Sequence, residues 1–153
     1  MHHQNPMDQL GIHIGRIDSA FDQWIHKQGL SYASFAVLYT LATAEGGSCT
    51  QKRICEEWFL SKQTVFSICK GLIDKGLLEL HESHQDRRER LLQLTPAGLA
   101  HAMPLAERAR AFGTAVFQTF GQERAAQLLA EMDALSTLME RTINTNDAFG
   151  KGS

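Results

Sequence analysis

The sequence predicts a mainly α-helical protein with one small β-hairpin, and three observations carry this prediction. Apolar residues recur at spacings of three and four along most of the chain, which is the pattern of helices with one buried face. Serine, threonine and glycine stand where these stretches begin and end, as expected for helix caps. Residues 77–94 instead hold two short apolar runs around a polar segment, which is typical of a hairpin.

Composition indicates a globular protein. Of 153 residues, 43% are hydrophobic and 21% are charged, enough apolar residues to build a core. No apolar run is long enough to cross a membrane, and the polar stretch from Met1 to Pro6 lacks the pattern of a secretory signal. Three cysteines are too few for a disulfide scaffold. We therefore expect a cytoplasmic protein with reduced thiols and no membrane partner.

The first helix is expected from about Met7 to Lys27, with Gly29 at its end. Its apolar stripe consists of Leu10, Ile14, Ile17, Phe21 and Ile25. Ser31 can cap a second helix, which the pair Gly46-Gly47 ends.

Two more caps follow. Thr50 can cap a third helix that runs to about Phe59, and Ser61 can cap a fourth that runs to about Lys75. Gly76 then stops the fourth helix. The apolar stripe of the fourth helix consists of Val65, Ile68, Cys69, Leu72 and Ile73.

The hairpin and the last helices complete the chain. Strands are expected at 77–80 and 90–94, with a polar loop at 81–89 between them. Thr95 and Pro96 are a helix cap and a first helical residue, so a fifth helix begins there. Its apolar positions include Leu99, Met103, Leu105 and Phe112. A sixth helix is expected over about 123–142.

The central order is helix, short strand, helix, turn, helix and two-stranded hairpin, which is that of a winged helix-turn-helix. The flanking helices carry more apolar stripe than one small domain can cover, which predicts a homodimer. The predicted parts are an N-terminal dimerisation helix (1–30), the winged helix-turn-helix domain (31–98), C-terminal dimerisation helices (99–145) and a disordered tail (146–153). Within the winged domain the recognition helix is placed at about 61–75 and the wing at about 77–94.

Charge excludes one class of DNA-binding protein. The formal net charge is −2, with 15 basic and 17 acidic residues, so the chain is not uniformly basic like a histone. Residues 51–95 carry a small positive excess and the remainder is acidic. Any binding to DNA must therefore depend on where individual cations lie on the surface.

Residues 86–98, Asp-Arg-Arg-Glu-Arg-Leu-Leu-Gln-Leu-Thr-Pro-Ala-Gly, resemble the wing of the MarR family of bacterial transcription regulators. The matching features are Asp86, Arg88, the pair Leu94-Thr95 and Gly98. Residues 60–65 and 72–77 resemble the beginning and the exit of the family's recognition helix, and the likeness covers roughly residues 10–142. The resemblance implies a homodimer that binds double-stranded DNA at a pseudopalindromic operator, represses transcription and responds to a small-molecule effector, often a phenolic or other aromatic anion.

The candidate DNA contacts are the side chains that the buried stripe of the fourth helix leaves exposed, together with the arginines of the wing. Gln63 can pair with adenine, and Lys62 or Lys70 can reach guanine or a phosphate in the major groove. An arginine at the hairpin tip suits the minor groove. The full set is Ser61, Lys62, Gln63, Thr64, Phe66, Ser67, Lys70, Arg87, Arg88 and Arg90. Asp86 is expected to fix the tip of the wing and to orient Arg88.

Four residues depart from the family pattern. Phe66 precedes Ser67 where a small hydroxyl residue and an arginine are common, and Gly71 replaces a common basic residue. Phe66 either contacts a thymine methyl group or packs sideways on the third helix. Phe59 stands in the turn where glycine is frequent, so the turn geometry is open to adjustment.

The effector pocket implied by the resemblance lies between the dimerisation helices and the winged domain. Its candidate lining is Trp24, Phe35, Tyr39, Met103 and Phe112. Each of these residues also fits an ordinary place in the core, so the two interpretations stay open.

Other chemistries have weaker support. A thiol sensor is one alternative, and Cys49 is expected to be the most exposed thiol. Cys55 and Cys69 fall on apolar faces, where a cysteine is usually a small core residue. His81, His84 and Asp86 have side chains that bind zinc, but a polar wing is expected anyway. The sequence has no phosphate-binding glycine loop, nucleophile elbow or His-Glu-x-x-His motif, so we expect neither an enzyme nor a cofactor. A winged helix that binds protein instead of DNA is the remaining alternative.

Overall fold

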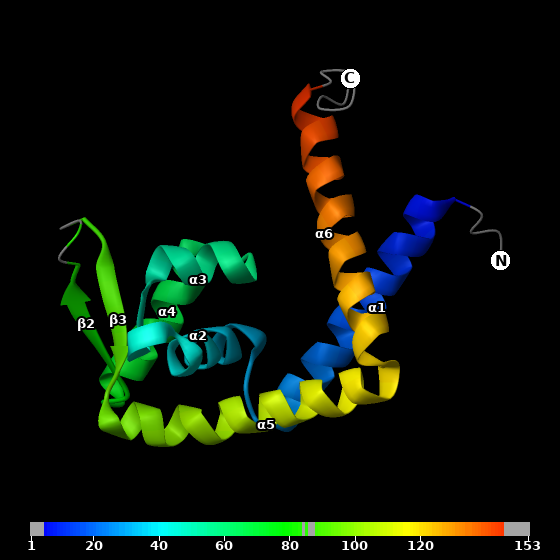
Figure 1. Cartoon of the computed structure of the whole chain (residues 1–153). Coiled ribbons are helices and arrows are strands. Elements are labelled where there is room, and N and C mark those ends of the chain that lie inside the picture. The colour runs from blue at the N-terminus through cyan, green and yellow to red at the C-terminus, as the bar shows by residue number, and fades with distance from the viewer. Residues whose placement is uncertain (1–4, 84, 86–87, 146–153) are drawn as a thin grey trace. The chain divides into compact units, whose positions relative to one another are not determined.

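The computed structural model describes residues 5–83, 85 and 88–145. Figure 1 labels the elements that these residues form. They are α1 (Pro6–Lys27), α2 (Tyr32–Thr43), the 3-10 helix η1 (Glu45–Gly47), β1 (Ser48–Thr50), α3 (Gln51–Trp58), α4 (Lys62–Asp74), β2 (Leu78–Glu82), β3 (Arg90–Leu94), α5 (Pro96–Phe120) and α6 (Gln122–Thr145). The chain divides into two compact units, Met1–Arg108 and Ala109–Ser153.

Side-chain caps begin α2 and α3 at the residues that the sequence predicts. Ser31 Oγ accepts a hydrogen bond from the backbone N–H of Ser34 at 3.2 Å at the start of α2. Thr50 Oγ1 does the same for Arg53 at 3.1 Å at the start of α3. Each cap satisfies one backbone N–H that the helix itself leaves without a partner. Local sequence therefore fixes where these helices begin.

The sheet has three antiparallel strands in the order β1-β3-β2. Leu92, at the centre of β3, lies opposite Cys49 on one side and Leu80 on the other. β2 is longer at its outer end than the sequence predicts, because Glu82 pairs with Arg90. The expected loop 81–89 is therefore shorter, and β1 makes the wing part of a sheet.

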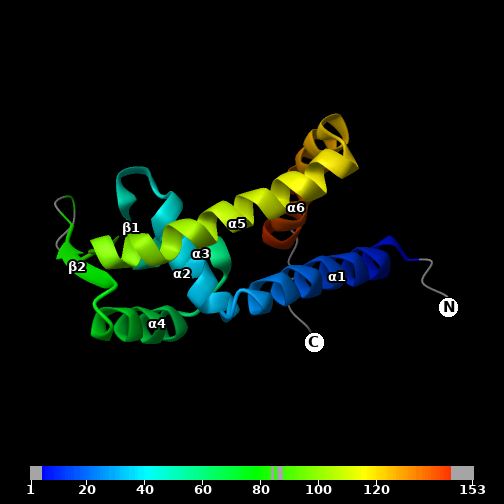
Figure 2. The ribbon, with the colours of Figure 1, turned by 90° about the horizontal axis from the view of Figure 1, so that it is seen from below.

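The core of the first unit lies between α2, α3, α4 and the sheet. Phe35, Leu38, Ile54, Val65 and Leu92 are each at most 1% exposed. α2 contacts α1, α3, α4, β1 and β3, and so forms the centre of this core. Figure 2 shows α4 at the lower edge of the same unit, and α4 contacts β2. One face of α4 is thereby left uncovered.

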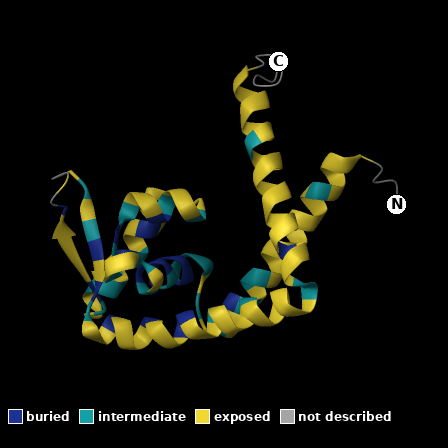
Figure 3. Ribbon diagram, viewed as in Figure 1, coloured by how far each residue is buried: buried dark blue, intermediate teal, exposed yellow. Residues whose placement is uncertain are grey.

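The second unit consists of the end of α5 and α6, and its apolar side chains are mostly exposed. Ala125 is the only buried residue among its described positions, 109–145. Figure 3 shows α6 as almost entirely exposed. Leu128, Met132, Leu135 and Met139 follow one another at spacings of four, three and four and are each 37–43% exposed. A stripe of this spacing lies on one face of a helix.

The first part of α1, like α6, carries apolar side chains that are exposed. Ile25, near the end of α1, is fully buried, whereas Ile14 and Ile17 are 43% and 60% exposed. The predicted stripe of α1 is therefore covered only toward its end. Within the described ranges, no helix is long and apolar enough to cross a membrane.

Candidate nucleic-acid interface

The recognition helix α4 is held by its inner face and capped at its start. Val65 and Cys69 are 0% and 3% exposed and fix which side of the helix faces the core. Ser61 Oγ accepts the backbone N–H of Thr64 at 3.1 Å, and the hydroxyls of these two residues are 2.8 Å apart. The seven contact candidates on this helix are all exposed, namely Ser61, Lys62, Gln63, Thr64, Phe66, Ser67 and Lys70.

The wing places further cations at the outer end of its hairpin. Arg88 and Arg90 are both exposed, and Arg90 begins β3 directly opposite Glu82. The backbone N–H of Ser83 donates to the carbonyl oxygen of Glu89 at 3.1 Å, which continues the ladder one step past the strands. Arg87 and Asp86 lie outside the described residues, so their predicted roles stay predictions.

A cavity of about 440 Å³ joins the wing to the starts of α3 and α4. Lys62 from α4 and Arg88 and Arg90 from the wing share its lining, although the sequence places the wing more than twenty residues later. The other lining residues are Thr50, Gln51, Lys52, Cys55, Glu56 and Glu89. Basic side chains outnumber acidic ones in this lining, whereas the whole chain has a net charge of −2. The lining therefore attracts anions although the chain as a whole is acidic.

Two lining residues of α3 are absent from the predicted contacts. Lys52 is exposed and lies 3.9 Å from Glu56, an ion pair that is too exposed to hold it strongly. Gln51 Nε2 donates to the backbone carbonyl of Lys62 at 3.3 Å and so ties the start of α3 to the start of α4. The sequence signal that could have identified Gln51 and Lys52 as contact candidates is their position in the first turn of a capped helix.

Thr95 and Gly98 lock the wing to α5. The hydroxyl of Thr95 donates to the carbonyl oxygen of Gly76 at 2.7 Å and accepts the N–H of Gly98 at 3.0 Å. A Cβ atom at Gly98 would overlap the backbone carbonyl oxygen of Leu77 and lie 2.9 Å from its carbonyl carbon. Only glycine therefore allows α5 to approach the exit of α4 this closely.

The turn before α4 contains a strained phenylalanine. Phe59 has φ 52° and ψ 45°, the left-handed conformation that glycine adopts more easily, and its N–H donates to the carbonyl of Cys55. Its side chain is 94% exposed. The turn thus keeps a glycine-like backbone without a glycine, which answers the question that the sequence left open.

Comparisons with known proteins agree with this geometry. Residues 28–89 match the sequence model of the MarR family. The structure of NMB1585, a MarR family regulator from Neisseria meningitidis, is similar at 53% identity and a TM-score of 0.84, over 94% of this chain and 100% of that one. The chain belongs to the MarR family.

Structures of lower sequence identity share the fold. BpsR from Bordetella bronchiseptica, whose DNA binding is regulated by 6-hydroxynicotinic acid, is 20% identical with a TM-score of 0.65, over 89% of this chain and 96% of that one. MepR of S. aureus in a DNA-binding conformation is 18% identical with a TM-score of 0.69, over 88% of this chain and 98% of that one. No protein with a curated description matches the chain. The MarR family consists of transcription regulators, and the chain shares its winged helix-turn-helix fold.

In this MarR family protein the aromatic effector candidates form part of a ring cluster. Phe35 is 1% exposed and its ring lies 5.7 Å from that of Trp24 and 5.2 Å from that of Tyr39. Phe35 is therefore a core residue, while Trp24 and Tyr39 are half-buried beside it. Met103 is 41% exposed on α5, and Phe112 belongs to the second compact unit.

The cysteines differ from the expectation. Cys49 is 4% exposed because β1 pairs with β3, so the prediction that it is the most exposed thiol is wrong. Burial raises the pKa of Cys49 to about 11 and that of Cys69 to about 12, which keeps both as unreactive thiols at neutral pH. Cys55 is half-buried at the cavity and is the more accessible one. These positions weaken the thiol-sensor alternative.

The histidines of the wing are the residues that the sequence offers as possible metal ligands. His81 Nε2 lies 3.3 Å from Glu79 Oε2 on β2. Two other candidate ligands, His84 and Asp86, lie outside the described residues. Within 5–83, 85 and 88–145 no group of three or more His, Cys, Asp or Glu side chains could hold a metal ion.

Proposed function

We propose that this MarR family protein is a homodimeric, sequence-specific DNA-binding regulator that represses transcription by occupying promoter DNA. The observation that carries the proposal is the cavity at which Lys62 of α4 meets Arg88 and Arg90 of the wing. A recognition helix and a cationic wing that converge in this way suit a duplex, which offers a major groove beside phosphates and a minor groove.

In the proposed complex α4 enters the major groove with its exposed face. Gln63 is suited to the paired donor and acceptor of adenine, and Ser67 can reach either kind of base edge. Lys62 and Lys70 would neutralise phosphates or reach guanine. Thr64 and Ser61 lie in the first turn of α4, where backbone N–H groups favour a phosphate oxygen, although their hydroxyls already bond each other.

The wing would hold the neighbouring backbone or minor groove. Arg88 and Arg90 are its described cations, and Lys52 of α3 adds a third basic side chain near the same cavity. Because the whole chain has a net charge of −2, this local group and the lysines of α4 must supply the attraction. DNA affinity should therefore fall steeply as salt concentration rises.

Dimerisation is supported by the uncovered apolar side chains of α1, α5 and α6. Ile17 of α1, Phe117 of α5 and Leu135 of α6 are each at least 40% exposed. A second copy would cover such surface through the same patch on both chains. Two recognition helices could then read major grooves about 34–36 Å apart on a pseudopalindromic site.

A small-molecule effector completes the proposal. Its support is that the similar structure of BpsR concerns regulation by 6-hydroxynicotinic acid, and that of PcaV from Streptomyces coelicolor holds that protein's natural ligand. We place the effector beside Trp24, Tyr39 and Met103 of the first unit, with Phe35 as the buried backing. Trp58 also lies beside Tyr39, with ring centroids 6.2 Å apart, so the test starts from a Trp58→Phe background. Aromatic carboxylic acids should then quench or shift the fluorescence of Trp24, and further substitution Trp24→Phe should remove that response.

The test of DNA binding is a selection from random-sequence duplexes followed by titration at two salt concentrations. We expect one enriched pseudopalindrome and a binding constant that decreases strongly with salt. Lys62→Ala should weaken binding and reduce the salt slope by about one unit. Lys75→Ala is the matched control, since it removes the same charge from the opposite end of α4, and it should leave both quantities nearly unchanged.

Two results would contradict the proposal. A parent protein that enriches no sequence and binds random DNA with little dependence on salt would favour the protein-binding winged helix instead. Equal losses in Lys62→Ala and Lys75→Ala would indicate that only overall charge matters, which is non-specific binding.

A further inference from the structure

Phe66 is an exposed aromatic side chain on an otherwise polar helix face. It is 57% exposed, although phenylalanine is usually buried in folded proteins. The sequence left two roles open, and this exposure disfavours packing of the ring against α3. A single exposed phenylalanine is common on protein surfaces, so its neighbours decide whether it matters.

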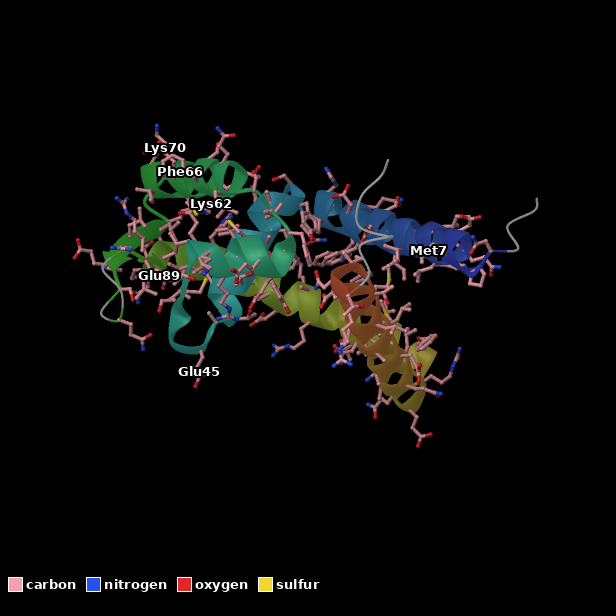
Figure 4. All side chains as sticks on the ribbon, turned by 90° about the horizontal axis from the view of Figure 1, so that it is seen from above. Met7, Glu45, Lys62, Phe66, Lys70 and Glu89 are labelled. Atoms are coloured by element: carbon pink, nitrogen blue, oxygen red, sulfur yellow. The ribbon has the colours of Figure 1, made fainter. Side chains whose placement is uncertain are left out.

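Those neighbours are two cations. Lys62 and Lys70 precede and follow Phe66 by four residues, and all three side chains are exposed on α4 (Figure 4). Residues four apart lie on successive turns of one helix edge, about 6 Å apart along its axis. The row is therefore lysine, phenylalanine, lysine, with an apolar surface between two positive charges.

The row cannot turn away from a partner of α4. Val65 and Cys69 are buried, and Phe66 lies about 100° and about 60° from them around the helix axis, on the flank of the exposed face. Burying Phe66 would require a turn of about 100° that moves Val65 out of the core, so the ring stays at the edge of the surface that α4 presents to a partner. The two lysines favour a polyanion as that partner.

In a DNA major groove the two kinds of side chain would do different work. Ammonium groups attract phosphates in any sequence. A phenyl ring has no hydrogen-bonding group for the polar base edges, and the apolar group that the four bases offer in this groove is the C5-methyl group of thymine. The ring would thus distinguish a thymine from the other bases.

We propose that Phe66 is a specificity-determining residue that contacts the methyl group of one thymine in each half-site. This inference rests on the proposed function, because it assumes that α4 enters the major groove. To that function it adds the base that Phe66, a residue that departs from the usual family pattern, would recognise. Such a contact would let a helix with few cations discriminate between sequences.

The experiment removes one methyl group at a time. A duplex that carries the site enriched by the parent protein is synthesised with each thymidine replaced in turn by deoxyuridine. The parent, Phe66→Ala and Phe59→Ala are titrated against each duplex. Phe59→Ala is the matched control, because it removes another highly exposed phenylalanine, in the turn outside the lysine row.

We expect one replacement in each half-site to weaken the parent about fourfold, the factor that corresponds to about 0.8 kcal/mol for one buried methyl group. Phe66→Ala should bind that duplex and the unmodified one equally well. Phe59→Ala should keep the parent's fourfold difference. Phe66→Leu, which retains an apolar side chain, should keep part of it.

The possible failures are distinguishable. If the parent enriches a site but every replacement affects it and Phe66→Ala alike, this inference is wrong and the proposed function stands. If the parent enriches no site, both are wrong, and a protein partner becomes the better explanation for the exposed ring. Unfolding temperatures of Phe66→Ala and Phe66→Leu should match the parent, because the side chain is mostly exposed, and this confirms that a lost difference reflects binding.

Discussion

Leu92 and Leu135 illustrate how differently the two compact units place the same side chain. Leu92 is fully buried at the centre of β3, between strands of the three-stranded sheet. Leu135 lies in a regular apolar stripe on α6 and is 40% exposed. The winged unit closes a core within one chain, whereas the helices of the second unit present apolar surface that a single chain leaves uncovered. The contrast is between a unit that buries its own core and helices whose exposed apolar surface is the support for the proposed dimer.

The largest expected effect comes from placing a charge in the uncovered stripe. Leu135→Glu should raise the dissociation constant of the dimer by a factor of about 100 or more, because two leucines lose apolar burial and two carboxylates enter an apolar interface. Analytical ultracentrifugation over a range of concentrations measures the change. Gln127→Glu, an exposed polar position on the same helix, is the control and should leave assembly unchanged. A variant that remains as dimeric as the parent would remove this stripe from the interface.

The next effect tests the closed core of the winged unit. Gly98→Ala should lower the free energy of unfolding by about 3 kcal/mol, because the added Cβ overlaps the backbone of Leu77 and neither side is a flexible side chain. Gly71→Ala has open space around its Cβ in α4 and should raise stability by up to about 1 kcal/mol. Urea denaturation at one fixed protein concentration compares them, since the proposed dimerisation would make apparent stability depend on concentration. Equal stabilities would disprove the close approach of α5.

A smaller effect is expected on DNA binding when an arginine of the winged unit is compared with one of the second unit. Arg88→Ala should weaken binding to the selected DNA by about 1–3 kcal/mol, since the residue belongs to the cationic group of the wing. Arg110→Ala removes the same side chain from α5 in the second unit and should change affinity little. Fluorescence anisotropy with a labelled duplex separates the two. Full affinity in Arg88→Ala would sink the role of the wing.

The smallest effect concerns the turn between α3 and α4. Phe59→Gly should stabilise the protein by about 0.5–1 kcal/mol, because glycine relieves the left-handed backbone at φ 52° while losing more entropy on folding. Phe66→Gly, at another exposed phenylalanine but within a helix, should destabilise by about 1 kcal/mol. The opposite signs in urea denaturation would show that backbone conformation, and not the loss of a phenyl ring, sets the result. Destabilisation by both changes would argue that Phe59 packs against something.

Most of the fold was predictable because its signals are local. The caps at Ser31, Thr50 and Ser61 act on N–H groups within three residues, and apolar spacing shows which helix face is buried. The contact candidates on α4 followed by elimination from that buried face, and all of them are exposed. The outer end of β2 was missed because its polar residues, His81 and Glu82, resemble a loop and join the ladder only through their partners in β3.

The sequence by itself thus determined the order of helices and strands, the winged helix-turn-helix and the exposed face of α4. Tertiary structure alone decided which distant residues meet. Cys49 is buried by pairing with Leu92, Gly98 is required by the carbonyl of Leu77, and Lys62 shares a cavity with Arg88. The physical reason is range: caps and periodicity depend on neighbours a few positions away, whereas these contacts join segments whose approach is set by packing of the whole core.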